Sequence, residues 1–215
     1  MRRTITFASL LMCVLLLLPA CQKRPAGAAD VSTAIPYDMK VGVVPFSQPT
    51  TVSELITGFI PEKQGRIPAD ALSNLDGMLR STLSTTKRLY TWIPYSKKST
   101  TDMHDSVSPM GLGHWLNVAR QYKIDLMLVP MIMDWHQRQG SSAGVTESAH
   151  VRAEFFLLDV RNGRVLRRSI YEEKQVGLAD DMTKMGSFFR RKGSCVEAEV
   201  LAQEAMDKAV KELGL

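Results

Sequence analysis

The sequence predicts an α/β fold, specifically an α+β sandwich in which a mixed β-sheet of about five strands packs against three helices. Three observations predict it. Short apolar runs rich in valine, isoleucine and leucine indicate buried strands, and apolar residues spaced three and four apart indicate amphipathic helices. The two kinds of segment alternate before a hairpin and a last helix, so the expected order is strand, helix, strand, helix, three strands, helix.

Residues 1–20 are predicted to be a lipoprotein signal peptide. Arg2 and Arg3 precede an apolar run over residues 7–18, which is shorter than the roughly 20 residues that a membrane-spanning helix needs. The run closes with Leu18-Pro19-Ala20-Cys21, in which a small residue precedes a cysteine. Pro19 departs from the usual pattern, so an ordinary signal peptide with an incidental cysteine is the alternative.

Cys21 is therefore the predicted lipidation site and the first residue of the mature chain. It would carry a diacylglyceryl group and further acyl chains such as palmitate, and two or more chains hold a protein stably at a membrane. Gln22 follows in place of Asp, which by resemblance to Gram-negative lipoproteins favours the outer membrane. The protein is thus expected to be anchored there and to face the periplasm.

Residues 21–36 contain Pro25, Gly27 and Pro36 without an apolar period, so they are predicted to be a flexible tether. Residues 37–215 are then a single periplasmic α/β domain. Its hydrophobic and charged fractions are those of a globular protein.

Charge and cysteine content exclude two classes of protein. The chain has 27 Lys and Arg against 22 Asp and Glu, which is too small an excess to indicate a nucleic-acid partner. Cys13 leaves with the signal peptide and Cys21 is acylated, so Cys195 has no cysteine to pair with and no internal disulfide is expected. The fold must be held by its core.

The domain begins with a Val-rich segment, residues 37–46, that is predicted to be a buried strand. Residues 47–68 contain five Pro and Gly residues and are expected to form an irregular loop. Loops of this length are often functional. The apolar side chains of residues 47–68 either pack onto the domain or form a patch that contacts a partner; they are Val52, Leu55, Ile56, Phe59 and Ile60.

Two helices and a strand follow. Residues 69–86 have leucines at helical spacing after Pro68, and residues 89–93 indicate a short strand. After a polar loop over residues 95–109, Ser108-Pro109 is a suitable cap and first turn for a helix ending at Tyr122.

The remaining segments complete the sheet and its cover. Residues 124–135 are almost entirely apolar and predict the central strand, in which Pro130 indicates a bulge or an edge. Asn162-Gly163 predicts a hairpin between strands over residues 150–160 and 164–176. Residues 197–213 have the apolar stripe of an amphipathic helix.

Three segments carry a resemblance to a known superfamily: residues 40–46, residues 124–129 and residues 157–165, followed by an Ala-rich last helix. They resemble bacterial envelope proteins that include the periplasmic domain of the curli secretion lipoprotein, the lipoprotein activators of penicillin-binding proteins, and the amino-terminal domain of the Tol-Pal translocation protein. The resemblance implies protein binding without catalytic residues. A curli-type pore would need additional membrane-spanning strands. It is not expected, because the segments that could supply them, residues 47–68 and 95–109, contain too many prolines and polar residues.

A basic stretch before the last helix is the candidate contact site for a partner or a membrane. Two aromatic residues are followed by three cations, which could dock on an anionic membrane, on peptidoglycan or on an acidic protein; they are Phe188, Phe189, Arg190, Arg191 and Lys192. The alternative is that both phenylalanines lie in the core. The hairpin arginines would extend the positive surface; they are Arg161, Arg164, Arg167 and Arg168.

No metal site is predicted, because no HxH, CxxC or HExxH spacing occurs. The alternative hypothesis is a metal-dependent enzyme that uses His136 and His150, which flank a Gly/Ser loop with Asp134 and Glu147 nearby. Cys195 is interpreted as structural, although cations close to it in sequence could make it reactive.

The leading hypothesis is a lipid-anchored, non-enzymatic binding module that recruits or regulates envelope machinery, such as peptidoglycan synthesis or surface assembly. Its expected partners are the membrane, through the lipid at Cys21, and an envelope protein or peptidoglycan. No cofactor is expected. A homo-oligomeric structural subunit at the outer membrane is a further alternative.

Overall fold

The computed structural model describes residues 34–95, 109–140, 145–175 and 196–215. All described residues belong to one compact unit, Ser32–Leu215. Within the described residues, no helix combines the length and the apolar character needed to cross a membrane.

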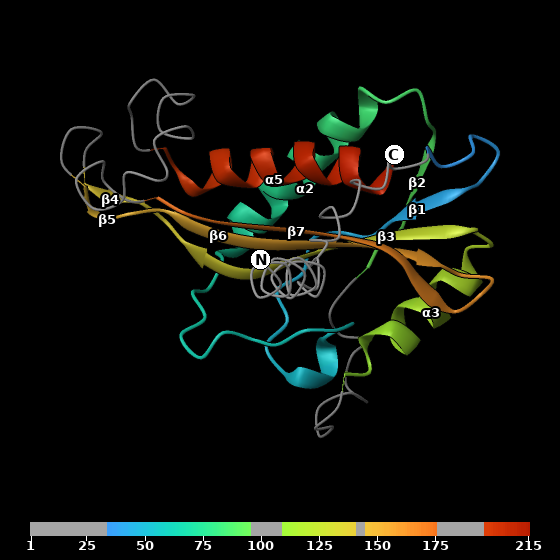
Figure 1. Cartoon of the computed structure of the whole chain (residues 1–215), viewed down its shortest axis with the longest axis horizontal. Helices are drawn as coiled ribbons and strands as arrows, with labels where there is room; N and C mark the ends of the chain where they lie inside the picture. The colour runs from blue at the N-terminus through green and yellow to red at the C-terminus, as the bar shows by residue number, and fades with distance from the viewer. Residues whose placement is uncertain (1–33, 96–108, 141–144, 176–195) are drawn as a thin grey trace, which may run out of the picture. The chain divides into compact units, whose positions relative to one another are not determined.

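A five-stranded mixed sheet forms the middle layer, with the strand order β2-β1-β3-β6-β7 (Figure 1). Strand β1 pairs in parallel with both of its neighbours, β2 and β3, whereas β6 is antiparallel to both of its neighbours, β3 and β7. The bounds of the five strands are β1 Val41–Val43, β2 Tyr90–Trp92, β3 Leu126–His136, β6 His150–Asp159 and β7 Arg164–Lys174. The predicted mixed sheet of about five strands is confirmed.

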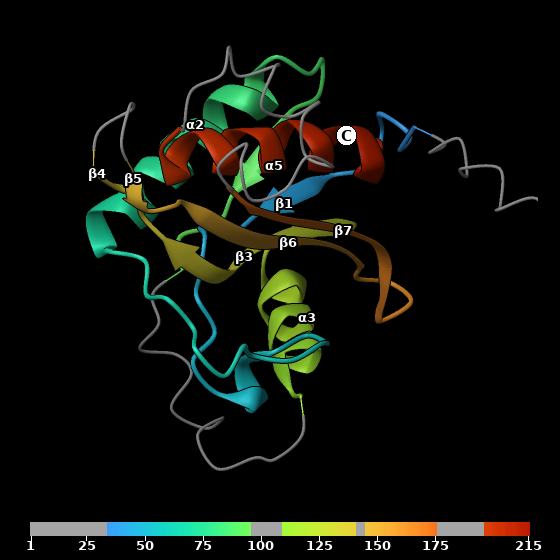
Figure 2. The same ribbon diagram turned by 60° about the vertical axis from the view of Figure 1, so that its left-hand side comes forward.

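Helices cover both faces of this sheet. Helices α2 (Ala69–Ser84) and α5 (Ala198–Leu213) lie together on one face, and α3 (Gly111–Gln121) lies on the other (Figures 1 and 2). A 3-10 turn, η1 (Val52–Glu54), belongs to the long loop over residues 47–68, on the same side as α3 (Figure 2). The α+β class with three helices, as predicted, is confirmed for the described residues.

The sheet separates two apolar cores, and β6 contributes to both because its side chains alternate. Phe155 packs with Leu75 of α2 and Leu201 of α5 in one core. Phe156 packs in the other core with Trp115 of α3. Successive side chains of β6 therefore enter opposite cores.

The boundaries predicted for the first strand and for the helix after Ser108 are wrong, for different reasons. The first strand has only three residues, because its pairing with the neighbouring strands ends before Pro45, which cannot donate a ladder hydrogen bond. Helix α3 begins at Gly111 instead of Pro109, and the Gly111 N–H donates to the carbonyl of Leu55 at 2.9 Å. The start of α3 is thus tied to the long loop, a tertiary contact that local sequence does not show.

Strand β3 contains a bulge, but not at Pro130. The register with β6 is regular at Pro130, opposite Phe155, and shifts between Ile132 and Asp134. The Pro130 carbonyl accepts a hydrogen bond from Ser47 N, in the chain that continues beyond the end of β1. Ser47 also forms a parallel bridge with Met131, so Pro130 lies between β6 and the chain that continues from β1, and not at an edge of the sheet. Neither the edge nor the bulge predicted at Pro130 is found at that residue; the bulge lies between Ile132 and Asp134.

A small second sheet lies outside the predicted elements. Strands β4 (Gln139–Gly140) and β5 (Val145–Glu147) form an antiparallel pair within the region predicted as a Gly/Ser loop. The main hairpin was correctly predicted: β6 and β7 are joined by four residues ending at Gly163, whose φ of 65° suits glycine.

Candidate functional site

The bulge in β3 determines which face of the sheet carries the candidate site. Before the bulge, Leu128 and Ile132 face the core beneath α2 and α5; after it, Trp135 faces that core. One extra residue has therefore reversed the alternation. As a result, Asp134 and His136 project from the opposite face, toward the side that also carries α3 and the long loop.

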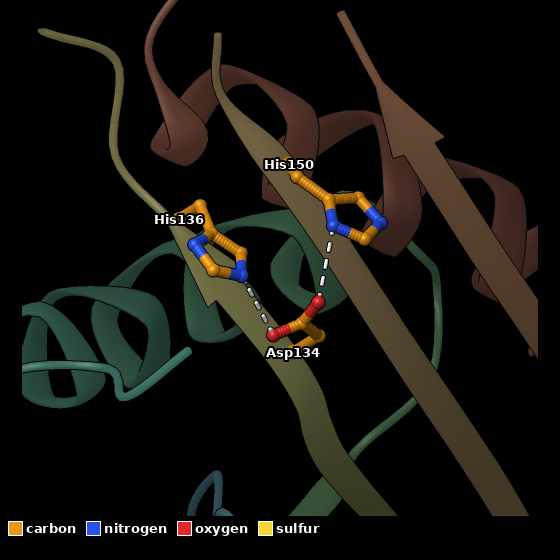
Figure 3. A group of neighbouring side chains, drawn as sticks. All are labelled: Asp134, His136 and His150. Atoms are coloured by element: carbon orange, nitrogen blue, oxygen red, sulfur yellow. Dashed lines mark ion pairs between the residues drawn. The ribbon is translucent and has the colours of Figure 1, made fainter. Parts of the chain in front are cut away.

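Asp134, His136 and His150 converge on this face (Figure 3). His136 Nε2 lies 3.2 Å from Asp134 Oδ1, and His150 Nδ1 lies 3.0 Å from Asp134 Oδ2. The two imidazole rings are nearly parallel, with an angle of 9° and 5.8 Å between their centroids. His136 and His150 are direct cross-strand partners, so β-sheet pairing itself brings the rings together.

The Asp134 carboxylate is buried and held by the backbone. Its Oδ1 accepts hydrogen bonds from Gly65 N at 2.6 Å and from Trp135 N at 3.1 Å. Gly65 lies so close that an added Cβ would be 2.1 Å from the Trp135 carbonyl oxygen and 2.8 Å from His136 Nε2. The long loop therefore packs its backbone directly on the cluster, which requires glycine at position 65.

Glu172 of β7 is a fourth group that sequence reasoning missed. Its Oε1 lies 3.6 Å from His150 Nε2, on the far side of the ring from Asp134. Glu147, which the sequence placed near the histidines, instead accepts a hydrogen bond from Gln139 Nε2 at 2.8 Å in the small hairpin. The register of the predicted hairpin is the signal that could have found Glu172, because it puts this residue opposite Arg152, two positions from His150.

Buried ion pairs extend the cluster across β6 and β7. Glu154, which is fully buried, binds Arg168 through Oε2 at 2.6 Å and Arg152 through Oε1 at 3.2 Å. Arg152 also reaches Glu172 at 3.3 Å. A network of acidic and basic side chains, called the charge network below, therefore crosses the three strands; its members are Arg168, Glu154, Arg152, Glu172, His150, Asp134 and His136.

The hairpin arginines that were expected to extend a positive surface differ in their surroundings. Arg168 is neutralised by Glu154, and Arg167 Nη1 donates to the Leu213 carbonyl at the end of α5, at 2.7 Å. Arg164 remains exposed, 3.9 Å from Asp159. Two of the four cations thus serve the fold, because each meets a partner across the domain that local sequence does not reveal.

An aromatic cleft lies elsewhere, between the long loop and α3. It has a volume of about 180 Å³, and its lining includes Tyr95, His114 and Trp115. His114 Nε2 lies 3.1 Å from the Tyr95 hydroxyl, and the Tyr95 and Trp115 rings are 4.5 Å apart. Burial lowers the pKa of His114 and raises the pKa of Tyr95. The cleft thus combines apolar walls with a neutral, hydrogen-bonded imidazole.

The apolar residues of the long loop divide between the two roles that the sequence left open. Leu55 and Ile56 are buried in the core beneath α3. Val52 and Phe59 are exposed, by 42% and 59%. The Phe59 ring lies under the guanidinium of Arg152, 4.7 Å from its centroid, so one edge of the charge network is covered by an exposed aromatic side chain.

Several predicted site residues lie outside the described part of the chain. They are Cys21, Cys195 and the basic stretch formed by Phe188, Phe189, Arg190, Arg191 and Lys192. The signal peptide and most of the tether also lie outside it. These assignments stay predictions.

No protein-family model matches the sequence, and no curated protein matches it. Among solved structures, similarity is found to the PelC dodecamer from Paraburkholderia phytofirmans, with 16% identity over 85% of this chain and 92% of that chain, at a TM-score of 0.47. Lipoprotein GNA1162 from Neisseria meningitidis matches with 16% identity over 72% of this chain and 94% of that chain, at a TM-score of 0.35. The LpoB C-terminal domain from Escherichia coli matches with 13% identity over 66% of this chain and 88% of that chain, at a TM-score of 0.35.

Bacterial lipoproteins are thus among the structures similar to this chain, as the resemblance noted in the sequence predicts. At such TM-scores the similarities give no information on what the chain binds, which must be inferred from its own residues.

Proposed function

We propose that this chain is a lipid-anchored, non-enzymatic binding module that recruits or regulates cell-envelope machinery from the periplasmic side of the outer membrane. The signal pattern that ends at Cys21 supports the anchor, and the tether after it would let the domain reach a partner away from the lipid. An envelope protein is the proposed partner, with peptidoglycan synthesis or surface assembly as the process served.

The observation that carries the proposal is a firmly held loop with exposed apolar side chains. Gln64 Nε2 donates to the carbonyls of Pro49 and Met133, at 3.0 and 2.9 Å, and Gln48 hydrogen-bonds both Gly65 O and Ile67 N. Residues 47–68 are therefore tied to β3 and to themselves. A preformed surface loses little conformational entropy on binding, so its apolar side chains can contribute to affinity.

Phe59 is the proposed centre of this surface. It is 59% exposed, and its ring stacks against Arg152, whose charge is shared by Glu154 and Glu172. Aromatic and arginine side chains are enriched among the residues that dominate binding energy at protein interfaces. Val52, on the same loop, and Met110, at the start of α3, add exposed apolar area, with 42% and 45% exposure.

Site-specific photocrosslinking in intact cells tests the proposal. A photoreactive phenylalanine analogue replaces Phe59 in the full-length chain, and the same analogue at Ser73, which is exposed on α2, is the control. We expect an envelope protein to be captured from position 59 and not from position 73, with less capture in Cys21→Ala. Capture of only a second copy would establish the homo-oligomeric alternative, and equal capture by Cys21→Ala would overturn the role of the anchor.

A matched pair of substitutions tests the surface without a crosslinker. Phe59→Ala should weaken association with the captured protein by tenfold or more, because hot-spot truncations cost about 2 kcal/mol or more. Leu89→Ala removes another apolar side chain, 92% exposed, next to β2, and should leave association unchanged. Equal effects of the two substitutions would show that Phe59 is not part of the interface.

A further inference from the structure

We propose that Asp134, His136 and His150 bind a divalent transition-metal ion, for which Zn²⁺ is the reference. The proposal is independent of the partner-binding function, because it rests on the donor atoms alone. Two imidazole nitrogens and one carboxylate oxygen form a ligand set that suits zinc and related ions.

The distances between donor atoms are close to what a metal ion requires. One donor atom from each of the three residues lies within 4.8 Å of the other two. In a tetrahedral zinc site with metal–ligand distances near 2.1 Å, the donors are about 3.4 Å apart. Each imidazole is near this distance from one carboxylate oxygen: His136 Nε2 lies 3.2 Å from Asp134 Oδ1, and His150 Nδ1 lies 3.0 Å from Oδ2. Binding through a single oxygen therefore requires small movements of the carboxylate and the imidazoles toward a common centre, and the His136 side chain is 46% exposed at the rim.

The groups behind the ligands are those that fix a metal ligand in place. The N–H groups of Gly65 and Trp135 both donate to Asp134 Oδ1, which orients the carboxylate and leaves Oδ2 directed at His150. Histidines that ligate metals through one nitrogen commonly direct the other toward a carboxylate. Glu172 occupies that position, 3.6 Å from His150 Nε2, and a small rotation of its half-exposed side chain would complete a hydrogen bond.

The site has a protein side and a solvent side. Asp134 is 6% exposed in its side chain and His150 is 19% exposed, whereas His136 lies at the rim. Three protein ligands with an open fourth position leave room for one water molecule. A bound ion would join the end of β3 to the start of β6 beneath the loop that carries Gly65, and so would stiffen the base of the proposed interaction loop.

Hydrogen bonds alone could also account for the cluster, and metal binding separates the two explanations. The full-length lipidated chain is extracted in detergent, freed of metal with a chelator and titrated with ZnCl₂ by calorimetry, with bound zinc counted after dialysis. We expect one Zn²⁺ per chain, a dissociation constant of micromolar or below, and an increase of several degrees in the unfolding temperature. A chain that retains no stoichiometric zinc would overturn the proposal.

Substitutions locate the ion. His136→Gln changes a rim residue and should preserve the fold, so loss of binding in this variant cannot be attributed to misfolding. His150→Gln should weaken binding at least as strongly, and Glu172→Gln should weaken it by about tenfold, as expected of an outer-shell carboxylate. His114→Gln, which removes a histidine in the separate aromatic cleft, is the matched control and should bind like wild type. Equal affinity of His136→Gln, His150→Gln and wild type would show that any zinc is bound elsewhere.

Discussion

Arg168 donates two hydrogen bonds to Glu154, from Nη2 at 2.6 Å and from Nε at 3.2 Å, and Glu154 is inaccessible to solvent. Arg152 contacts the other carboxylate oxygen. A buried carboxylate is tolerated only when its charge is neutralised and its oxygens are hydrogen-bonded. The centre of β6 therefore depends on cations from β6 itself and from β7.

Removing one of these cations should destabilise the fold strongly. Arg168→Met leaves Glu154 buried with a single partner, and we expect a loss of about 3–5 kcal/mol in the free energy of unfolding. Arg164→Met is the control, because Arg164 is 65% exposed and 3.9 Å from its partner; it should cost less than about 1 kcal/mol. Urea denaturation measures both. Similar losses for the two variants would contradict this account of the buried pair.

Two glycines in helices should respond to alanine in opposite directions. At Gly111, a Cβ would lie 2.6 Å from the Glu54 carbonyl oxygen and 2.7 Å from that of Leu55, so Gly111→Ala should cost about 1–3 kcal/mol. Gly77 of α2 is exposed with nothing within 4 Å, so Gly77→Ala should stabilise by up to about 1 kcal/mol. Thermal unfolding would show the opposite signs, and stabilisation by Gly111→Ala would refute the close approach of the loop to α3.

His114 should make stability depend on pH. Burial lowers its pKa from the ordinary 6.5, so the folded protein binds fewer protons there than the unfolded chain. Stability should therefore fall as the pH drops below about 6.5 and should level off only below the folded pKa. His114→Gln keeps a polar group near Tyr95 without a titration. The difference in unfolding free energy between the variant and wild type, measured at about pH 7.5 and 5.5, should shift in favour of the variant at the lower pH; a constant difference would count against a buried neutral imidazole.

Asp159 should make stability depend on pH in a more acidic range than His114 does. Burial opposes its ionisation, but two hydrogen bonds from Asn162 and the charge of Arg164 outweigh burial and lower its pKa. A lowered pKa stabilises the fold above the ordinary value of 3.8, and this stabilisation is lost as the pH falls through the folded pKa. Asn162→Ala should therefore be less stable than wild type at pH 7 by about 1 kcal/mol, with a smaller deficit near pH 3. If Asn162→Ala is destabilised equally at both pH values, the Asn162 side chain stabilises the turn without affecting the pKa of Asp159.

Periodic segments were predictable because the spacing of their apolar residues shows which side chains are buried. The leucines of α2 and the alternating residues of β6 occupy the cores that their periods indicate. Residues at 37–46 also have a strand-like composition, yet only Val41–Val43 pair as a strand. The length of a strand depends on how many residues of the neighbouring strands can pair with it, which no local sequence pattern shows.

The candidate site was only partly predictable for the same reason. The sequence placed Asp134, His136 and His150 near one another, since they flank a loop between two strands. It could not show the shift after Ile132 or the approach of Gly65, because both depend on contacts between distant segments. Glu172 needed the register of a second strand pair, and Glu147 was placed wrongly because β4 and β5 turn it toward Gln139.

The irregularity between Ile132 and Asp134 also bears on how relatives of this chain should be compared. A homologue could keep all three polar residues and yet, through the loss of a single residue from β3, direct Asp134 and His136 into the apolar layer beneath α5. Selection would then remove those residues or restore the strand length. Residue count in β3, and not only residue identity, would therefore distinguish relatives that share this cluster from relatives that share only the fold.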